Sequence, residues 1–353
     1  MIEFWRAGGG SESTNPEAAP AVEAEGWDGQ MFMDSQSLGR EPYVLMGAWA
    51  MRTERLKLGT GVTNPLTRHP AVTAAGAASV HAISGGRAVL GIGRGDSALA
   101  YLGYAPVRLP QFERALNNIQ TLLSGGEISF GGHDMLGDAP TLDSLALGHR
   151  PSGTQLKWLP PELPKVPLDV AATGPKVIEM SVALAERVTF SVGAMPERLD
   201  WAMDIARGVG RDGVSYGAQI IVVCDTDLDK AMEWAKSAVA PLARFQVMQG
   251  NAAGPTGGSD DANFSAVGES YDMTKHGKVH ETEKLVGTSF TPDFVKRFAV
   301  VGPPDHCIER LLELVRCGME RFVVVGPGFY DEPRGNRGGL FASEVMPAVR
   351  AAA

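Results

Sequence analysis

Short apolar runs alternate with longer helical segments along almost the whole chain, and this alternation limits the fold more than any other feature. Eight runs read as strands, several of them rich in Val, Ile and Leu without polar alternation, as in strands buried on both faces. They cover residues 2–5, 30–33, 56–62, 87–92, 167–172, 187–191, 218–223 and 321–325. The helical segments cover residues 17–25, 42–51, 70–83, 111–123, 176–185, 196–207, 227–245 and 303–316. Repeated strand–helix units predict parallel strands that close as a (β/α)8 barrel of the TIM type.

Helix-capping residues support the last helical segment better than the first. The last segment has Pro303 and Pro304 in its first turn, and Gly318 stands where a C-terminal cap belongs. The first segment contains Pro20 well inside the expected helix, where proline removes a backbone hydrogen bond and clashes with the preceding turn. We therefore expect the first segment to be the less regular of the two.

Two insertions interrupt the alternation. Residues 125–167 contain a short strand-like piece, EISF, followed by Gly, Pro and isolated apolar residues, and residues 248–289 join a Gly-rich turn region to a polar stretch. Insertions of this length are usually either functional loops or surface segments. Because strand candidates continue on both sides of each insertion, we predict a single domain over residues 1–353.

Composition excludes several classes of partner. The 353 residues carry a formal net charge of −9, which leaves no basic surface for nucleic acid or anionic lipid. No apolar run approaches the length of a membrane span, and the N-terminus lacks the basic and apolar regions of a signal peptide. The three cysteines are odd in number and lack the spacing of a metal site, which fits a protein of a reducing compartment. We expect a cytoplasmic protein that binds a small molecule and neither nucleic acid nor membrane.

The stretch VLGIGRGDS, at residues 89–97, permits three interpretations. A dinucleotide-binding fingerprint needs G-x-G-x-x-G and an acid at the end of the next strand, but the glycines are Gly91, Gly93 and Gly95, and the acid in range, Glu113, lies in a helical segment. An Arg-Gly-Asp adhesion motif needs an exposed loop, whereas this tripeptide directly follows a buried strand. The remaining interpretation is the C-terminal end of the fourth barrel strand, where barrel enzymes place their chemistry.

Two neighbouring strand ends carry features that suit ligand binding. The second strand is followed by Asp34 and Ser35, which place a carboxylate and a hydroxyl at the same rim. The third strand runs into GTGVTNPLTRHP, where Gly59 and Gly61 indicate either a bulge or a close approach of a ligand to the backbone.

The fifth strand is followed by Thr173, Gly174 and Pro175, and Pro175 suits the first turn of a helix. Free backbone N–H groups at a helix N-terminus, together with a hydroxyl and a glycine, make a natural phosphate site. The alternative is a helix start with no ligand.

The motifs GTGVTNPLTRHP, SGGRAVLGIGRGDS and FAVVGPPDHCIERL, with MIEF at the start, resemble the bacterial luciferase-like superfamily. They are most similar to the branch that contains methylene-tetrahydromethanopterin reductase and other oxidoreductases dependent on coenzyme F420. The resemblance covers most of the chain and fails across the two insertions. It implies a (β/α)8 barrel, a homodimer, and a cofactor across the C-terminal mouth. It also implies a cis peptide bond between Gly61 and Val62, with Thr63 and Asn64 beside the cofactor ring.

The same resemblance assigns further roles. The cofactor phosphate would lie at Arg94, Thr173 and Gly174, and we also expect Asp34 and Ser35 among the cofactor contacts. Acidic residues near the reactive face of the deazaflavin would fall on Asp96 and Glu3, as the candidates for proton handling. The sequence thus favours hydride transfer between coenzyme F420 and a small organic substrate.

Two departures from the family pattern keep alternatives open. Ser35 stands where sugar-phosphate dehydrogenases of the superfamily carry a histidine, so no sugar-phosphate substrate is inferred. Arg94 resembles the arginine with which flavin-dependent luciferases bind the phosphate of FMN. An FMN-dependent monooxygenase is therefore the first alternative, and a non-catalytic flavin-binding or scaffold protein is the second.

Each candidate also has a structural interpretation. Asp34 could cap a turn, and Glu3, a charge within an apolar strand, could form a structural ion pair. Arg94 could pair with Asp96 or Asp34 and bind nothing.

Histidine spacing gives no metal prediction. His69 and His81 flank one helix without a further ligand pattern. His276 and His280 are four residues apart, but no third ligand is evident, and we expect both on the surface. We predict no metal site.

Overall fold

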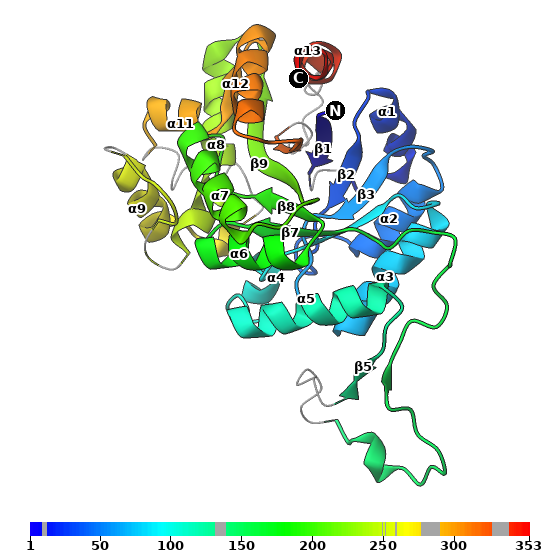
Figure 1. Cartoon of the computed structure of the whole chain (residues 1–353). Coiled ribbons are helices and arrows are strands. Elements are labelled where there is room, and N and C mark those ends of the chain that lie inside the picture. Colours follow the sequence, from blue (N-terminus) through cyan, green and yellow to red (C-terminus); the bar gives the residue numbers. More distant parts are fainter. Residues whose placement is uncertain are drawn as a thin grey trace.

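The computed structural model describes residues 1–8, 13–130, 139–248, 250, 252–257, 260–276, 290–326 and 339–353. Eight parallel strands close into a barrel in the order β1-β2-β3-β4-β7-β8-β9-β11, with helices on the outside (Figure 1). Their bounds are β1 (Glu3–Ala7), β2 (Gly29–Phe32), β3 (Lys57–Thr60), β4 (Ala88–Ile92), β7 (Leu168–Ala172), β8 (Arg187–Phe190), β9 (Ser215–Cys224) and β11 (Arg321–Val325). The predicted (β/α)8 barrel is confirmed, and every predicted strand overlaps one of these eight.

A further strand, β10 (Val300–Gly302), was not predicted from the apolar runs. It pairs in parallel with the last three residues of β9, beginning with Val300 opposite Val222. Strand β9 is ten residues long, so its first part closes the barrel against β8 and β11 while its end extends to β10.

The helices follow the predicted pattern with shifts at their ends. The helices in the predicted segments are α1 (Ala19–Ala24), α2 (Pro42–Ala50), α3 (Pro70–Ile83), α5 (Leu109–Leu123), α6 (Pro175–Leu184), α7 (Pro196–Val209), α8 (Leu228–Val247) and α12 (Pro304–Arg316). Pro20 proves harmless, because a 3-10 turn (η1, Pro16–Ala18) precedes α1 and leaves Pro20 in the first turn of that helix.

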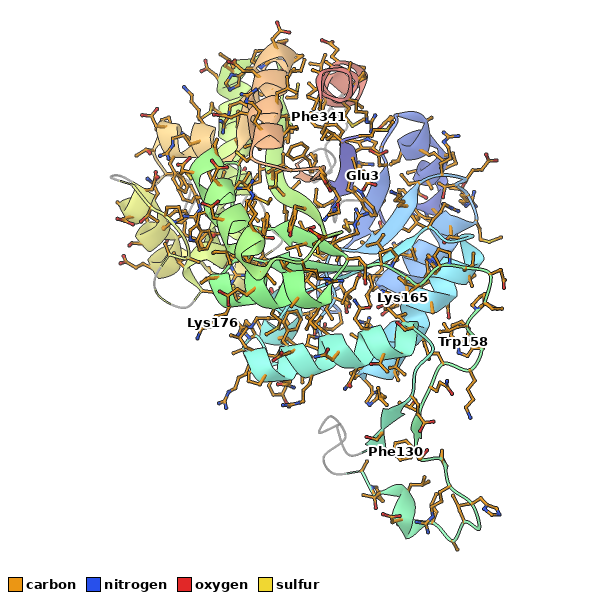
Figure 2. The ribbon with its side chains drawn as sticks, in the orientation of Figure 1. Glu3, Phe130, Trp158, Lys165, Lys176 and Phe341 are labelled. Atoms are coloured by element: carbon orange, nitrogen blue, oxygen red, sulfur yellow. The ribbon has the colours of Figure 1, made fainter. Side chains whose placement is uncertain are left out.

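The first insertion projects from the barrel as an extended arm (Figure 1). Its two short strands, β5 (Ile128–Ser129) and β6 (Gly153–Thr154), pair antiparallel, and a 3-10 turn, η3 (Leu142–Ser144), lies between them. Phe130 and Trp158 are exposed on this arm (Figure 2).

The second insertion contains helical structure that the sequence pattern did not reveal. Helix α9 (Asp260–Ser270) packs on α8, and a 3-10 turn, η4 (Met273–Lys275), follows it. Three other helices were not predicted either: α4 (Ser97–Ala100), α11 (Pro292–Phe298) and α13 (Met346–Ala352).

Apolar side chains fill the middle of the barrel. Trp5, Met31, Val89 and Val323 form a buried cluster between the strands. Gly29 makes room for it, because a Cβ there would lie 2.3 Å from the Trp5 ring. The two ends of the barrel are therefore separated by a packed layer.

The start of β1 is covered by the C-terminal segment. Phe341, in a π-helical turn (η6, Phe341–Val345) before α13, packs edge-on against Phe4 and stacks with Trp27. Arg350 of α13 donates to the carboxylate of Asp28 at 2.7 Å. Within the described part of the chain, no helix combines the length and apolar character needed to cross a membrane.

Candidate active site

The residues that follow β3 lie against the end of β4 at the C-terminal mouth of the barrel. The Gly61–Val62 peptide bond is cis, as predicted. Beyond it, the Thr63 N–H donates to the Gly91 carbonyl at 3.0 Å, and the Gly93 N–H donates to the Thr63 carbonyl at 2.9 Å. The predicted bulge at the end of β3 is therefore present.

The glycines of this bulge make room for the protein itself. A Cβ on Gly59 would lie 2.8 Å from the sulfur of Met31, and one on Gly61 would lie 2.6 Å from Cβ of Met31. The close approach that these glycines indicated is thus made by an interior side chain.

Asn64 carries an unsatisfied donor at this bulge. Its side-chain oxygen accepts from the backbone N–H groups of Leu66 and Thr67, both at 3.0 Å. Its side-chain nitrogen is buried and has no hydrogen-bond partner among the described residues. A buried amide without an acceptor costs free energy, so this group suits a ligand that supplies one.

Asp34 and Ser35 are buried after β2 and already have partners. Arg68 holds Asp34 through both of its terminal nitrogens, with Nη2 at 3.2 Å from Oδ1. The Ser97 hydroxyl lies 3.3 Å from that of Ser35. Asp34 therefore fixes the loop after β3, and its contact with a cofactor stays a prediction.

Arg94 forms neither of the structural pairs considered for it. Asp34 is paired with Arg68 and Asp96 with Arg244, and in the described part of the chain no carboxylate lies within ion-pair distance of Arg94. Its Nε donates to the carbonyl of Val107 at 2.7 Å. Burial lowers the pKa of Arg94. A half-buried cation without a counter-charge is the arrangement expected of an anion site.

Thr173 and Gly174 lie beside Arg94. Strands β4 and β7 are neighbours, and Ile92 pairs with Val170, so the residues beyond them reach the same level of the mouth. Gly174 precedes the first turn of α6, whose start has no side-chain cap. A Cβ on Gly174 would meet nothing within 4 Å, so open space borders this helix start.

Asp96 is tied to the second insertion. It forms an ion pair with Arg244 of α8, whose guanidinium carbon lies 4.8 Å from the centre of the Tyr271 ring. The Tyr271 hydroxyl is hydrogen-bonded to Nδ1 of His276. Sequence reasoning placed His276 on the surface, but it is half-buried in this cluster, and His280 lies outside the described residues.

The environment of the cluster shifts two protonation equilibria. Burial raises the pKa of Tyr271 to about 12, against the opposing charge of Arg244. Burial also lowers the pKa of His276, while the nearby charge of Asp96 acts in the opposite direction. At neutral pH both side chains are therefore uncharged.

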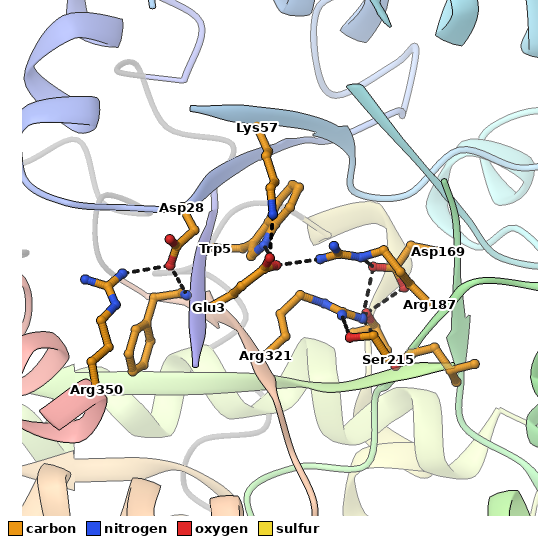
Figure 3. A network of polar contacts seen from close by, with 12 residues as sticks. Glu3, Trp5, Asp28, Lys57, Asp169, Arg187, Ser215, Arg321 and Arg350 are labelled. Carbon is orange, nitrogen blue, oxygen red and sulfur yellow. Dashed lines mark hydrogen bonds and ion pairs between the residues drawn. The ribbon is translucent and has the colours of Figure 1, made fainter. Parts of the chain in front are cut away.

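Glu3 lies at the opposite end of the barrel. It opens β1, and the apolar layer around Trp5 separates it from the mouth. Arg187 binds its carboxylate at 2.9 Å, the Trp5 indole N–H donates to it at 2.8 Å, and Lys57 completes the set (Figure 3). The structural ion pair considered for Glu3 is the arrangement that the structure shows.

The network around Glu3 extends across the base of the barrel. Asp169 lies 3.2 Å from Nη2 of Arg321 and accepts from the Thr189 hydroxyl at 2.8 Å, and Arg321 donates to Ser215 at 3.0 Å (Figure 3). These groups come from the first residues or the interior of five neighbouring strands, at the end that serves stability in such barrels.

Sequence reasoning missed Arg244 and Tyr271 altogether. Arg244 lies in a predicted helix, and its partner Asp96 is 148 positions away. Tyr271 follows a helix that was not predicted. The only available signal was a tyrosine and a histidine close together in YDMTKH, and that pattern indicates no chemistry by itself.

Comparison with known proteins decides the family. The family model described as luciferase-like monooxygenase matches residues 5–321. The chain belongs to this family. It is 28% identical to a 5,10-methylenetetrahydromethanopterin reductase of Archaeoglobus fulgidus over 93% of each chain. It is 27% identical to an F420-dependent glucose-6-phosphate dehydrogenase of Microbacterium testaceum, over 88% of this chain and 84% of that protein.

The solved structures show the same fold. The structure of the coenzyme F420 dependent tetrahydromethanopterin reductase of Methanopyrus kandleri superposes with a TM-score of 0.72 and 21% identity. The match covers 98% of this chain and 99% of that one. The two chains thus share the barrel fold over almost their whole lengths.

Proposed function

We propose that this chain is an oxidoreductase that moves a hydride between coenzyme F420 and a small organic substrate at the barrel mouth. Two relatives that match it over most of their length are an F420-dependent dehydrogenase and a methylenetetrahydromethanopterin reductase. Coenzyme F420, when bound, supplies a deazaflavin carbon that accepts or gives the hydride. The chain's own residues bind the cofactor, orient it and handle the accompanying proton.

The observation that carries this proposal is the set of unsatisfied groups at the mouth. Arg94 has no carboxylate partner among the described residues, and the start of α6, which follows the neighbouring strand, is open at Gly174. These groups fit the phosphate that a deazaflavin or flavin cofactor carries. Asn64 supplies a buried donor next to the cis bond, which fits a polar edge of the cofactor ring.

Titration of the purified protein with coenzyme F420 and, separately, with FMN tests the proposal. We expect coenzyme F420 to bind and Arg94→Ala to weaken its binding roughly tenfold to a hundredfold, since a charge-assisted contact contributes about 1.5–3 kcal/mol. Arg108→Ala is the matched control, because Arg108 is an exposed arginine at the start of α5. Equal affinity of Arg94→Ala and wild type would contradict the assignment of Arg94.

An FMN-dependent monooxygenase is the second candidate. It is favoured by the family as a whole, whose model is described as a monooxygenase, and by Arg94, which suits the phosphate of FMN equally well. Tight binding of FMN without binding of coenzyme F420 would select it. Binding of neither cofactor would favour a scaffold protein.

We further propose that the chain acts as a cytoplasmic homodimer built from single-domain subunits. Apolar side chains exposed on or beside helices α2 and α3 support an interface there: Val44, Met51, Val72 and Ile83. Sedimentation analysis of the purified protein tests the dimer, and a monomer at all concentrations would contradict it.

A further inference from the structure

The second insertion reaches the barrel mouth through two contacts. The Tyr101 hydroxyl, at the end of α4, donates to the Met273 carbonyl of η4 at 3.0 Å. Asp96, which directly precedes α4, pairs with Arg244 of α8, and Arg244 in turn lies against the Tyr271 ring. The segment that carries Tyr271 is thereby fixed next to the end of β4, where the proposed cofactor phosphate site begins.

Most charged groups in this cluster are committed to one another. Arg244 pairs with Asp96, and its side chain is only 10% exposed. Asp96 already accepts from Arg244. Tyr271 and His276 differ from this ion pair, because both are uncharged. Their side chains are hydrogen-bonded to each other, and each can take part in proton transfer.

The protonation states of Tyr271 and His276 limit which of them donates the hydrogen bond. Burial keeps the imidazole of His276 neutral at neutral pH, with Asp96 and Arg244 acting on it in opposite senses. Tyr271 stays protonated, and its O–H donates to Nδ1 of His276 when the neutral ring carries its proton on Nε2. The phenol oxygen accepts a hydrogen bond from Arg244 and keeps a second lone pair that can accept from a third group. That third group must be a donor, such as the hydroxyl of an alcohol.

We propose that Tyr271 and His276 form a proton relay for the oxidation of an alcohol at the barrel mouth. The substrate O–H gives its proton to the Tyr271 oxygen while the Tyr271 proton passes to Nδ1 of His276. The hydride of the carbinol carbon leaves for oxidised coenzyme F420, so a carbonyl product and an imidazolium result. Reduction of a carbonyl runs the same steps backwards. This inference rests on the proposed function, and it replaces Asp96 as the proton-handling group, leaving Asp96 to position Arg244.

The first test needs no cofactor. The ring resonances of His276, identified by their absence in His276→Gln, are followed by NMR against pH. In Tyr271→Phe we expect the titration midpoint to move, because the lost hydroxyl is hydrogen-bonded to Nδ1 and contributes differently to the neutral and the protonated ring. Tyr216→Phe is the matched control: it removes the same atom from a tyrosine near the start of β9, at the other end of the barrel, and the midpoint should stay as in wild type. An unchanged midpoint in Tyr271→Phe would overturn the relay.

The second test uses the protein loaded with oxidised coenzyme F420 and offered isopropanol or cyclohexanol. We expect Tyr271→Phe and His276→Gln to keep cofactor affinity and to lower turnover by about 10²–10⁴-fold, as for a lost general base. The limb of the pH–rate profile that reports His276 should disappear in His276→Gln. Tyr216→Phe should turn over like wild type.

The outcomes separate the relay from the proposed function. Failure of the wild-type protein to bind coenzyme F420 would overturn the proposed function. Binding without alcohol-dependent reduction of the cofactor, or turnover of Tyr271→Phe within a few-fold of wild type, would overturn the relay alone. Loss of cofactor affinity in Tyr271→Phe would also overturn it, since Tyr271 would then be a cofactor contact.

Discussion

Replacement of Glu3 by glutamine should cost stability and leave the chemistry intact. Burial alone would raise the pKa of Glu3, but the charge of Arg187 and hydrogen bonds from Lys57 and Trp5 outweigh it and lower the pKa from 4.5 to about 2. At about 1.4 kcal/mol per pKa unit, this difference corresponds to roughly 3 kcal/mol in favour of the folded carboxylate. The side chain is 25% exposed, so some solvent screening applies and we expect about 2–3 kcal/mol.

The loss should follow pH with a definite sign. A carboxyl whose pKa is depressed by folding stabilises the protein above its unfolded pKa, and this contribution fades as pH falls towards the folded value. The difference in unfolding free energy between wild type and Glu3→Gln should thus be constant from neutral pH down to about 5. It should shrink between about 4.5 and 2, where wild-type Glu3 itself takes up a proton.

Urea denaturation at a series of pH values measures this difference. Glu179→Gln serves as the control, because Glu179 is exposed on α6 and its loss should change stability by less than about 0.5 kcal/mol. Stability equal to wild type at neutral pH, or a loss that does not change with pH, would refute the electrostatic account. Intact stability together with abolished turnover would instead return Glu3 to a catalytic role.

Three further substitutions test the packing and the mouth. Gly174→Val should fold normally, because Gly174 has extended backbone angles and open space, but it should weaken cofactor binding at least tenfold in a titration. Gly29→Ala should destabilise the barrel by about 1–3 kcal/mol in urea, because its Cβ would overlap the Trp5 ring; wild-type stability would show that the ring can move. Arg198→Leu should cost about 3–5 kcal/mol, since this fully buried arginine donates to Gln246 and three backbone carbonyls; a loss under 1 kcal/mol would contradict that role.

The barrel strands could be predicted because each is an uninterrupted apolar run, which is how a strand buried on both faces must read. The same rule could not find β10. Its three residues lie between two helices, and the eight runs already completed a barrel without it. Helix α9 begins with two aspartates and has no apolar stripe of useful length, so only its packing against α8 identifies it.

Strand polarity predicts which residues lie at the barrel mouth, but it does not predict which side chains they contact. Residues that follow parallel strands meet at one rim, and this places Asp34, Asn64, Arg94 and Thr173 at the mouth. The same polarity places Glu3, the first residue of its strand, at the other end, and the sequence alone contained that information. The sequence could not show which charged side chains form ion pairs, because the partners lie far apart in the chain, as Asp96 and Arg244 do.

Gly95 determines which groups Arg94 and Asp96 contact. Gly95 has φ +95°, and a Cβ on it would lie 2.4 Å from a leucine side chain, so only glycine fits this turn. The turn sends Arg94 towards the Val107 carbonyl and Asp96 towards Arg244. Had the two paired with each other, each would have neutralised the other at the rim. Their separation leaves Arg94 without a carboxylate partner among the described residues, as the proposed phosphate site requires, and it links Asp96 through Arg244 to the Tyr271 ring.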